Sequence, residues 1–397
     1  MAQALQIGSG AATQAAAEGG KAMEKKLSVA IAAGGTAGHI NPALALAEEL
    51  AARGHKVGFF GQQRRLEGTL VPQAGFELKS LNVTGFDRSR PWTLITALVR
   101  MRLAERELDR YFAEVGKPDV AIGFGAYIEL PLMRWCARHG VPTVLHEQNS
   151  VPGLANKTAA KKANKVCVAL PVAIDAFRDR AGASTQIVVT GNPVRRSVID
   201  ASREAGRADF DIAEAQTMLL VFGGSLGARH LNEGVAALKD ELLRRPELHI
   251  VHSTGKELFD EVTSALNLTD EQAARWEVRP YIDNMGEALA AADLVLSRAG
   301  ASSIAEIAAL AVPSMLVPYP FATADHQTTN ARYLVDAGAA VMLADDAIDT
   351  PAFAQELLSL VDDAARRDEM RERARGLAQD QAASVLADHV EAAAQGR

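Results

Sequence analysis

The sequence predicts an α/β protein of two domains, each built around a doubly wound parallel sheet. With 397 residues the chain is longer than one ordinary hydrophobic core requires. Short apolar runs alternate with longer segments of helical periodicity, which is typical of βαβ units. A Gly-rich turn at residues 34–38 follows the first apolar run, and a similar turn at 223–227 follows its counterpart in the second half. Each half therefore begins with the same strand-turn-helix unit.

In the first half, apolar runs and periodic segments alternate in order. We expect strands at residues 27–33, 56–60, 120–123, 143–146, 165–168 and 187–189. We expect helices at residues 42–53, 92–115, 128–138 and 153–162. The helix at 42–53 has the clearest limits, because Asn41 can cap it, Pro42 suits its first turn and Gly54 suits its end.

The pattern restarts in the second half. We expect strands at residues 217–222, 249–254, 294–297 and 314–317, and helices at 229–243, 284–292 and 303–310. The segment 201–216 between the halves is polar and weakly periodic, so we interpret it as a linker or surface excursion. Residues 1–22 are rich in Ala, Gly and Gln without the pattern of a secretory signal, and we expect them to form a disordered extension.

Composition argues against several classes of protein. Lys and Arg total 42 against 49 for Asp and Glu, a formal charge of -7, which disfavours a nucleic-acid partner. Cys136 and Cys167 lie in apolar stretches, as buried free thiols do. No uncharged apolar run approaches the roughly 18 residues that span a bilayer. Asp209 and Asp211 match an Asp-x-Asp pattern but lie far from any Gly-rich turn, so we expect a solvated pair and no metal site.

The two Gly-rich turns indicate a ligand bound between the domains. A glycine turn before a helix exposes backbone N–H groups at the positive helix end, which suits phosphate or a developing anion. Residues 34–39 lack the G-x-G-x-x-G spacing of dinucleotide sites, and no Gly-Lys-Ser/Thr follows them. Tight packing of helix on strand remains an alternative for either turn alone.

Polar residues follow several of the expected strands. A neutral His39 could accept a proton from a sugar hydroxyl, or simply bond at the helix entry. The run 146–149 places His146, Glu147 and Asn149 at the carboxyl end of a sheet, where His146 and Glu147 could instead brace the loop for Asn149. Glu306 could accept hydrogen bonds from a ribose diol or be a solvated acid of a first helical turn. Residues 325–330 could reach a sugar through amide groups.

One stretch interleaves apolar side chains with arginines. This pattern suits an anionic membrane surface, although an ordinary amphipathic helix with its apolar face in the core explains it equally well. The patch consists of Phe86, Arg88, Arg90, Trp92, Leu94 and Ile95.

Taken together, these motifs resemble those of the MurG family, bacterial N-acetylglucosaminyltransferases of glycosyltransferase family 28. The matching segments are GGTAGHINPALALAEEL, GFGAY, VPTVLHEQNSVPGLANK, GNPVR, FGGSLGARHLN, YIDNM, RAGASSIAEIAAL and DHQTTNA, in order from about residue 27 to 341. The resemblance implies the GT-B architecture, with two Rossmann-like domains facing a cleft. Residues 23–194 would form the acceptor and membrane domain, joined by a last helix at about 381–397, and residues 195–380 the UDP-sugar-binding domain.

The resemblance also implies the reaction and its location. The chain would transfer N-acetylglucosamine with inversion from UDP-N-acetylglucosamine to the 4-hydroxyl of the muramyl residue of undecaprenyl-diphosphate-linked muramyl-pentapeptide (lipid I), without a cofactor. This hexosyltransferase step belongs to peptidoglycan synthesis, and hence to cell shape and division. The enzyme would be peripheral on the cytoplasmic face of the bacterial plasma membrane. Two alternatives remain: another GT-B enzyme, such as a UDP-N-acetylglucosamine 2-epimerase or a glycolipid glycosyltransferase, and a non-catalytic nucleotide-sugar sensor.

Site residues follow from the matching motifs. The donor would contact Thr36, Ala37, Gly38, Asn149, Arg195, Ser225, Ile282, Ala301, Ser302, Ser303, Ile304, Ala305, Glu306 and Gln327. The acceptor diphosphate would contact Gly34, Gly35, Gly123, Gly125 and Tyr127, and His39 would be the catalytic base. Ala37 and Ala126 depart from the family pattern, since many members have Gly there.

Overall fold

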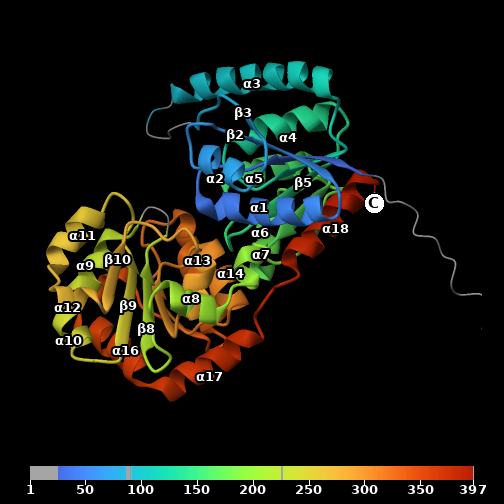
Figure 1. Cartoon of the computed structure of the whole chain (residues 1–397). Coiled ribbons are helices and arrows are strands. Elements are labelled where there is room, and N and C mark those ends of the chain that lie inside the picture. Colours follow the sequence, from blue (N-terminus) through green and yellow to red (C-terminus); the bar gives the residue numbers. More distant parts are fainter. Residues whose placement is uncertain (1–25, 86–89, 91, 225–226, 397) are drawn as a thin grey trace, which may run out of the picture.

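The protein is described by a computed structural model that covers residues 26–85, 90, 92–224 and 227–396. Two parallel sheets, each covered by helices on both faces, lie one in each half of the chain (Figure 1). The expected extension at residues 1–22 lies outside the described residues, as do Phe86, Arg88 and Ser225.

The N-terminal sheet has seven strands in the order β3-β2-β1-β4-β5-β6-β7, all parallel. They are β1 Ser28–Ala32, β2 Lys56–Gly61, β3 Leu78–Ser80, β4 Val120–Gly123, β5 Thr143–Glu147, β6 Lys165–Val168 and β7 Gln186–Val189. The chain winds outward from β1 to β3 and then returns to β4 beside β1. The strand order therefore reverses between β1 and β4, and ligands of such sheets bind at this point.

Helices of the N-terminal half bury an apolar core on each face of this sheet. They are α1 Ala37–Ala52, α2 Glu67–Gln73, α3 Thr93–Val115, α4 Glu129–Arg138, α5 Leu154–Ala159 and α6 Ile174–Arg178. The strand β3 and the helices α2 and α6 were not expected from the sequence.

The start of α1 differs from the expectation. The helix begins at Ala37 after an extended Thr36, so Pro42 lies inside it and Asn41 does not cap it. Proline has no N–H to bond the carbonyl four residues earlier. That carbonyl belongs to Gly38, and Ser302 Oγ of the C-terminal domain lies 3.4 Å from it. His39 consequently occupies the first turn of a helix that touches the other domain.

The C-terminal sheet has the order β10-β9-β8-β11-β12-β13 and is also parallel. Its strands are β8 Thr217–Phe222, β9 Leu248–Ser253, β10 Trp276–Arg279, β11 Leu294–Ser297, β12 Ser314–Leu316 and β13 Ala340–Met342. Its main helices are α9 Arg229–Ala237, α10 Lys239–Leu243, α11 Phe259–Leu266, α12 Asp270–Ala273, α13 Met285–Ala291, α14 Ala301–Ala309, α15 His326–Val335, α16 Pro351–Asp362 and α17 Ala364–Arg375. The strand order reverses between β8 and β11, which again marks a ligand site.

The segment 201–216 is not a linker. It contains α8 Arg203–Asp209, which packs on α13, and its Phe210 and Ile212 are buried in the core of the C-terminal domain. The short helix itself buries only Gly206 and Arg207, which explains its weak apolar periodicity. Asp209 and Asp211 are exposed on either side of buried Phe210.

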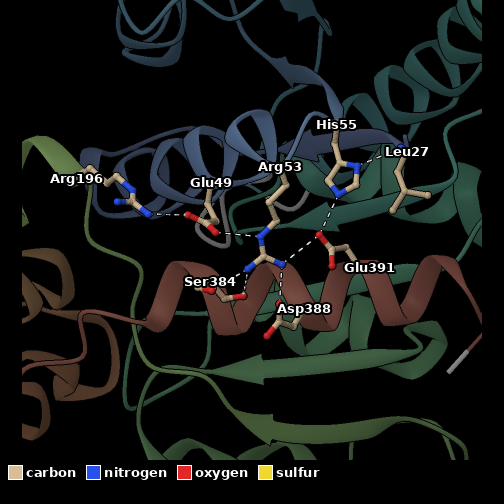
Figure 2. A network of polar contacts seen from close by, with 8 residues as sticks. All are labelled: Leu27, Glu49, Arg53, His55, Arg196, Ser384, Asp388 and Glu391. Atoms are coloured by element: carbon tan, nitrogen blue, oxygen red, sulfur yellow. Dashed lines mark hydrogen bonds and ion pairs between the residues drawn. The ribbon is translucent and has the colours of Figure 1, made fainter. Parts of the chain in front are cut away.

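The last helix, α18 Ala382–Ala394, returns to the N-terminal domain, where Leu386 and Val390 join the core beneath α1. Figure 2 shows how polar contacts reinforce this packing: Arg53, the residue that follows α1, donates to Ser384, Asp388 and Glu391 of α18. The chain thus crosses between the domains twice, once after β7 and once before α18. No helix among the described residues is long and apolar enough to cross a bilayer.

A candidate active site between the two domains

A cleft of about 1750 Å³ lies between the carboxyl ends of the two sheets. Both domains line this cleft. In each sheet, the point at which the strand order reverses faces the other domain. The wall contains most of the donor and catalytic residues expected from the sequence: Thr36, Ala37, Gly38, His39, Asn149, Arg195, Ile282, Ala301, Ser302, Ser303, Glu306 and Gln327.

The other expected residues that the structure describes lie outside this wall. Ile304 and Ala305 lie on the opposite side of α14, against a small cavity shared with Gln148 and Asn192 of the N-terminal domain. The turns expected to hold the acceptor diphosphate lie just beyond the cleft wall, after the adjacent strands β1 and β4. They comprise Gly34, Gly35, Gly123, Gly125 and Tyr127.

His39 lies where the cleft meets these turns. Its Nδ1 is 3.0 Å from Thr36 Oγ1, and burial together with nearby His326 lowers the pKa of His39 to about 4. The imidazole is therefore neutral at physiological pH. Gly125 has φ of +93°, and a Cβ atom there would lie 3.1 Å from His39 Cδ2. Glycine thus lets the second turn approach the imidazole.

Buried glutamates accept hydrogen bonds from backbone N–H groups in the turns of the N-terminal domain. Glu67 accepts from the N–H groups of Gly35 and Gln62 at 3.1 and 3.0 Å. Glu129 accepts from Gly125 N at 2.6 Å, and burial raises its pKa to about 8.

Glu147 holds the loop that carries Asn149. It accepts from Asn149 N and Gly153 N, each at 3.0 Å, and from Asn156 Nδ2 at 2.9 Å. His146 is fully buried with Nε2 2.9 Å from Gly191 O. These contacts match the bracing alternative for His146 and Glu147.

The donor half of the cleft surrounds the first turns of α14. Arg195 bonds Glu48 of α1 through Nε and Nη2, at 2.8 and 2.7 Å. Burial raises the pKa of Glu306 to about 7, opposed by a hydrogen bond from Asn41 and by the charge of Arg195. Gln327 Oε1 accepts from two backbone N–H groups, Ala299 at 3.1 Å and Tyr319 at 2.9 Å. This leaves the Nε2 amide of Gln327 as the group that a ligand can use.

Sequence reasoning missed several residues of the cleft wall. Arg298 pairs with Asp345 at 2.5 Å, and His230 Nδ1 lies 2.8 Å from the same carboxylate. Tyr281 also lines the cleft, as does Phe321, whose side chain is 83% exposed. Arg298 is the first residue of the matching segment RAGASSIAEIAAL and could have been included, whereas Asp345 follows β13 in a segment with no local signal.

Two family descriptions match the chain. Residues 29–168 match the glycosyltransferase family 28 N-terminal domain, and residues 218–389 match the glycosyltransferase family 28 C-terminal domain. A relative from Halothermothrix orenii is 36% identical over 369 residues, covering 91% of this chain and 98% of its own length. It is named UDP-N-acetylglucosamine–N-acetylmuramyl-(pentapeptide) pyrophosphoryl-undecaprenol N-acetylglucosamine transferase.

The chain belongs to glycosyltransferase family 28.

Solved structures agree with this family 28 assignment. The crystal structure of Acinetobacter baumannii MurG matches with a TM-score of 0.68 and 28% identity, covering 93% of this chain and all (100%) of that one. A UDP-GlcNAc 2-epimerase from Neisseria meningitidis matches with a TM-score of 0.64 but 11% identity, over 91% and 99% of the two chains, and shows the shared fold alone. The predicted GT-B architecture and glycosyltransferase class are confirmed.

Proposed function

We propose that this family 28 chain transfers N-acetylglucosamine from UDP-N-acetylglucosamine to the muramyl 4-hydroxyl of undecaprenyl-diphosphate-linked muramyl-pentapeptide. The observation that carries the proposal is the position of His39. Its neutral imidazole lies between the donor-facing cleft and Gly125 of the turn assigned to the acceptor. The relatives named as this transferase support the same substrates.

The donor binds along α14. The first amides of this helix and the Arg195 guanidinium supply positive potential for the diphosphate, because both border the cleft. Glu306 accepts from the ribose hydroxyls, and Ile282, which borders the cleft, adjoins the uracil. Gln327 donates from Nε2 to the sugar, since its oxygen is engaged by the backbone. Asn149 and residues 36–38 close the site from the opposite domain.

Transfer proceeds as one in-line displacement with inversion. The acceptor 4-hydroxyl oxygen forms a bond to the sugar C1 as the bond from C1 to the UDP oxygen breaks, and His39 Nε2 takes the hydroxyl proton. This role requires His39 Nδ1–H to donate to Thr36 Oγ1, 3.0 Å away, so that Nε2 carries the lone pair. The negative charge that develops on UDP is stabilised by Arg195 and the start of α14.

The N-terminal half of α3 docks on an anionic membrane surface. Trp92, just before the helix, and Ile95 within it are 67% and 68% exposed, whereas Leu108 and Phe112 near its end are buried against the core. An ordinary amphipathic helix would bury its apolar face along its whole length. Figure 1 places α3 at the outer edge of the N-terminal domain. The enzyme therefore works as a peripheral protein on the cytoplasmic face of the plasma membrane, without a nucleic-acid partner.

One assay separates this proposal from its alternatives. Purified protein is incubated with labelled UDP-N-acetylglucosamine, with and without a lipid-diphosphate muramyl-pentapeptide, and the products are identified. UDP release that depends on the acceptor, with a β-linked disaccharide product, is the expected result. Isomerisation of the donor without acceptor would point to an epimerase, and binding without turnover would point to a sensor.

A further inference from the structure

The Arg195 guanidinium reaches the cleft in a fixed orientation. Arg195 precedes the short helix α7 Arg196–Ile199 and lines the cleft, but its partner Glu48 belongs to α1 of the N-terminal domain. Nε and Nη2 of Arg195 lie 2.8 and 2.7 Å from the same oxygen, Glu48 Oε1. In the part of the chain that the structure describes, no contact is found for Nη1 of Arg195. One edge of the guanidinium is thus held and the other is left for a ligand.

The support beneath Glu48 is rigid. Adjoining turns of α1 pack into the core through Leu44, Leu46 and Leu50, which are fully buried. The next residue, Glu49, bonds Arg196 and Arg53, and Arg53 continues the network to α18 (Figure 2). Glu48 therefore stands on a helix that its own core packing holds in place, and the polar network of Glu49 is separate from the contact between Glu48 and Arg195. A site carried by such elements keeps its geometry better than one on a loop.

Two effects of Glu48 on an anionic ligand oppose each other. Its negative charge partly neutralises Arg195, and this weakens attraction to a phosphate. Its hydrogen bonds remove the rotamer freedom that a long side chain would otherwise lose on binding. Both side chains are partly exposed, so solvent screens the first effect, while the second is independent of screening. We therefore expect that Glu48 strengthens ligand binding by ordering Arg195 more than it weakens binding by neutralising part of the Arg195 charge.

We propose that Glu48 is a positioning residue of the donor site: it holds one edge of Arg195 so that the other edge meets the diphosphate of the nucleotide sugar. This inference rests on the proposed function, in which Arg195 binds that diphosphate. It makes the acceptor domain a contributor to donor affinity. A donor bound to the C-terminal domain alone would lack this ordered arginine.

The test is a double-mutant cycle with UDP as the probe, measured by titration calorimetry on the full chain. Glu48→Ala should weaken UDP binding about two- to tenfold, the cost of ordering one long side chain. Glu48→Gln should recover most of this loss, because its amide oxygen can still accept from Nε and Nη2. In an Arg195→Ala background, Glu48→Ala should have no further effect.

Kinetics and a neighbouring control complete the test. Glu48→Ala should raise the KM for the donor and also lower kcat, because Arg195 stabilises the charge that develops on UDP, while the acceptor KM stays unchanged. Glu49→Ala, which removes the partner of Arg196 and Arg53, should leave UDP affinity at the wild-type value.

The inference is overturned if Glu48→Ala leaves UDP affinity unchanged or tightens it, or if its effect persists without Arg195. It also fails if Glu49→Ala weakens binding equally, because the loss would then be a general effect on α1. A chain that binds UDP but transfers no sugar would refute the proposed function and leave the cycle interpretable.

Discussion

Replacing Glu129 by Gln should stabilise the protein, increasingly so as the pH rises. Glu129 is fully buried, and its Oε2 accepts from Gly125 N at 2.6 Å. Its Oε1 has no partner among the described residues. Burial, and secondarily the nearby charge of Glu147, raise the pKa of Glu129 from an ordinary 4.5 to about 8. At pH 7 this carboxyl is protonated in the folded protein and ionised in the unfolded chain.

The size of the effect follows from this difference in pKa. Below pH 4.5 both states hold the proton, and above pH 8 both have lost it, so stability falls with rising pH only between these values. The slope there is about 1.4 kcal/mol per pH unit. Because pH 7 lies 2.5 units above the ordinary pKa of 4.5, this gives an upper limit of about 3 kcal/mol at pH 7. Glutamine does not titrate, so the variant does not lose stability as the pH rises, and its amide oxygen can still accept from Gly125 N.

Urea unfolding of both proteins between pH 5 and pH 8 measures the difference, with the midpoint of the N-terminal domain followed by the fluorescence of buried Trp135. Glu105→Gln is a suitable control. That buried carboxylate pairs with Arg134 and Arg138 at 2.9 and 2.8 Å, so its loss should destabilise the domain at every pH in this range. A gain for Glu129→Gln that does not change with pH, or a loss at pH 8, would refute the reasoning.

Three further predictions concern the reaction and the membrane. His39→Gln should lower kcat by about 10²–10⁴-fold with UDP affinity unchanged, and near-normal turnover would remove His39 from the base role. The pKa of Glu306 is about 7, so UDP affinity of the wild type should fall as the pH drops through 7, because the protonated carboxyl has lost one hydrogen-bond acceptor. Glu306→Gln should bind UDP about tenfold more weakly, and its affinity should not depend on pH in this range. If both proteins follow the same pH profile, Glu306 does not bind the ribose. Trp92→Glu should reduce sedimentation with anionic vesicles while sparing turnover of a soluble acceptor, and unchanged sedimentation would contradict the membrane proposal.

Strands with buried faces were predictable because their signal is local. The limits of β4 and β6 match the expected 120–123 and 165–168, since every residue of these strands is buried. The edge strand β3 has three residues, none buried, and so gives no apolar run. The start of α1 was misplaced because Asn41-Pro42 is a good local start signal, yet the glycine turn after β1 begins the helix earlier.

In the candidate site too, features that are local in the sequence could be predicted, and contacts between distant segments could not. Motifs that follow one strand, such as residues 36–39 and 301–306, could be found from the sequence because turn and helix start are adjacent in the chain. The partners that orient them could not. Glu48 and Arg195 are separated by 147 positions and meet only because the chain crosses between the domains beside α1. Asp345 reaches Arg298 from the far edge of the C-terminal sheet for a similar reason.

The carboxyls beneath the acceptor turns raise an electrostatic problem, because a diphosphate would be repelled by negative charge directly below it. Glu147, beneath the neighbouring loop that carries Asn149, accepts from four N–H groups, and these oppose the rise in its pKa that burial causes. Glu129 has one such donor, from Gly125, and is neutral at pH 7. Above pH 8 it becomes a charge next to the turn assigned to the diphosphate. The acceptor KM should therefore rise at alkaline pH in the wild type and stay constant in Glu129→Gln. The donor KM depends mainly on residues of the C-terminal domain, so its change with pH should be the same in both proteins. A wild-type acceptor KM that stays level to pH 9 would place the diphosphate away from Gly125.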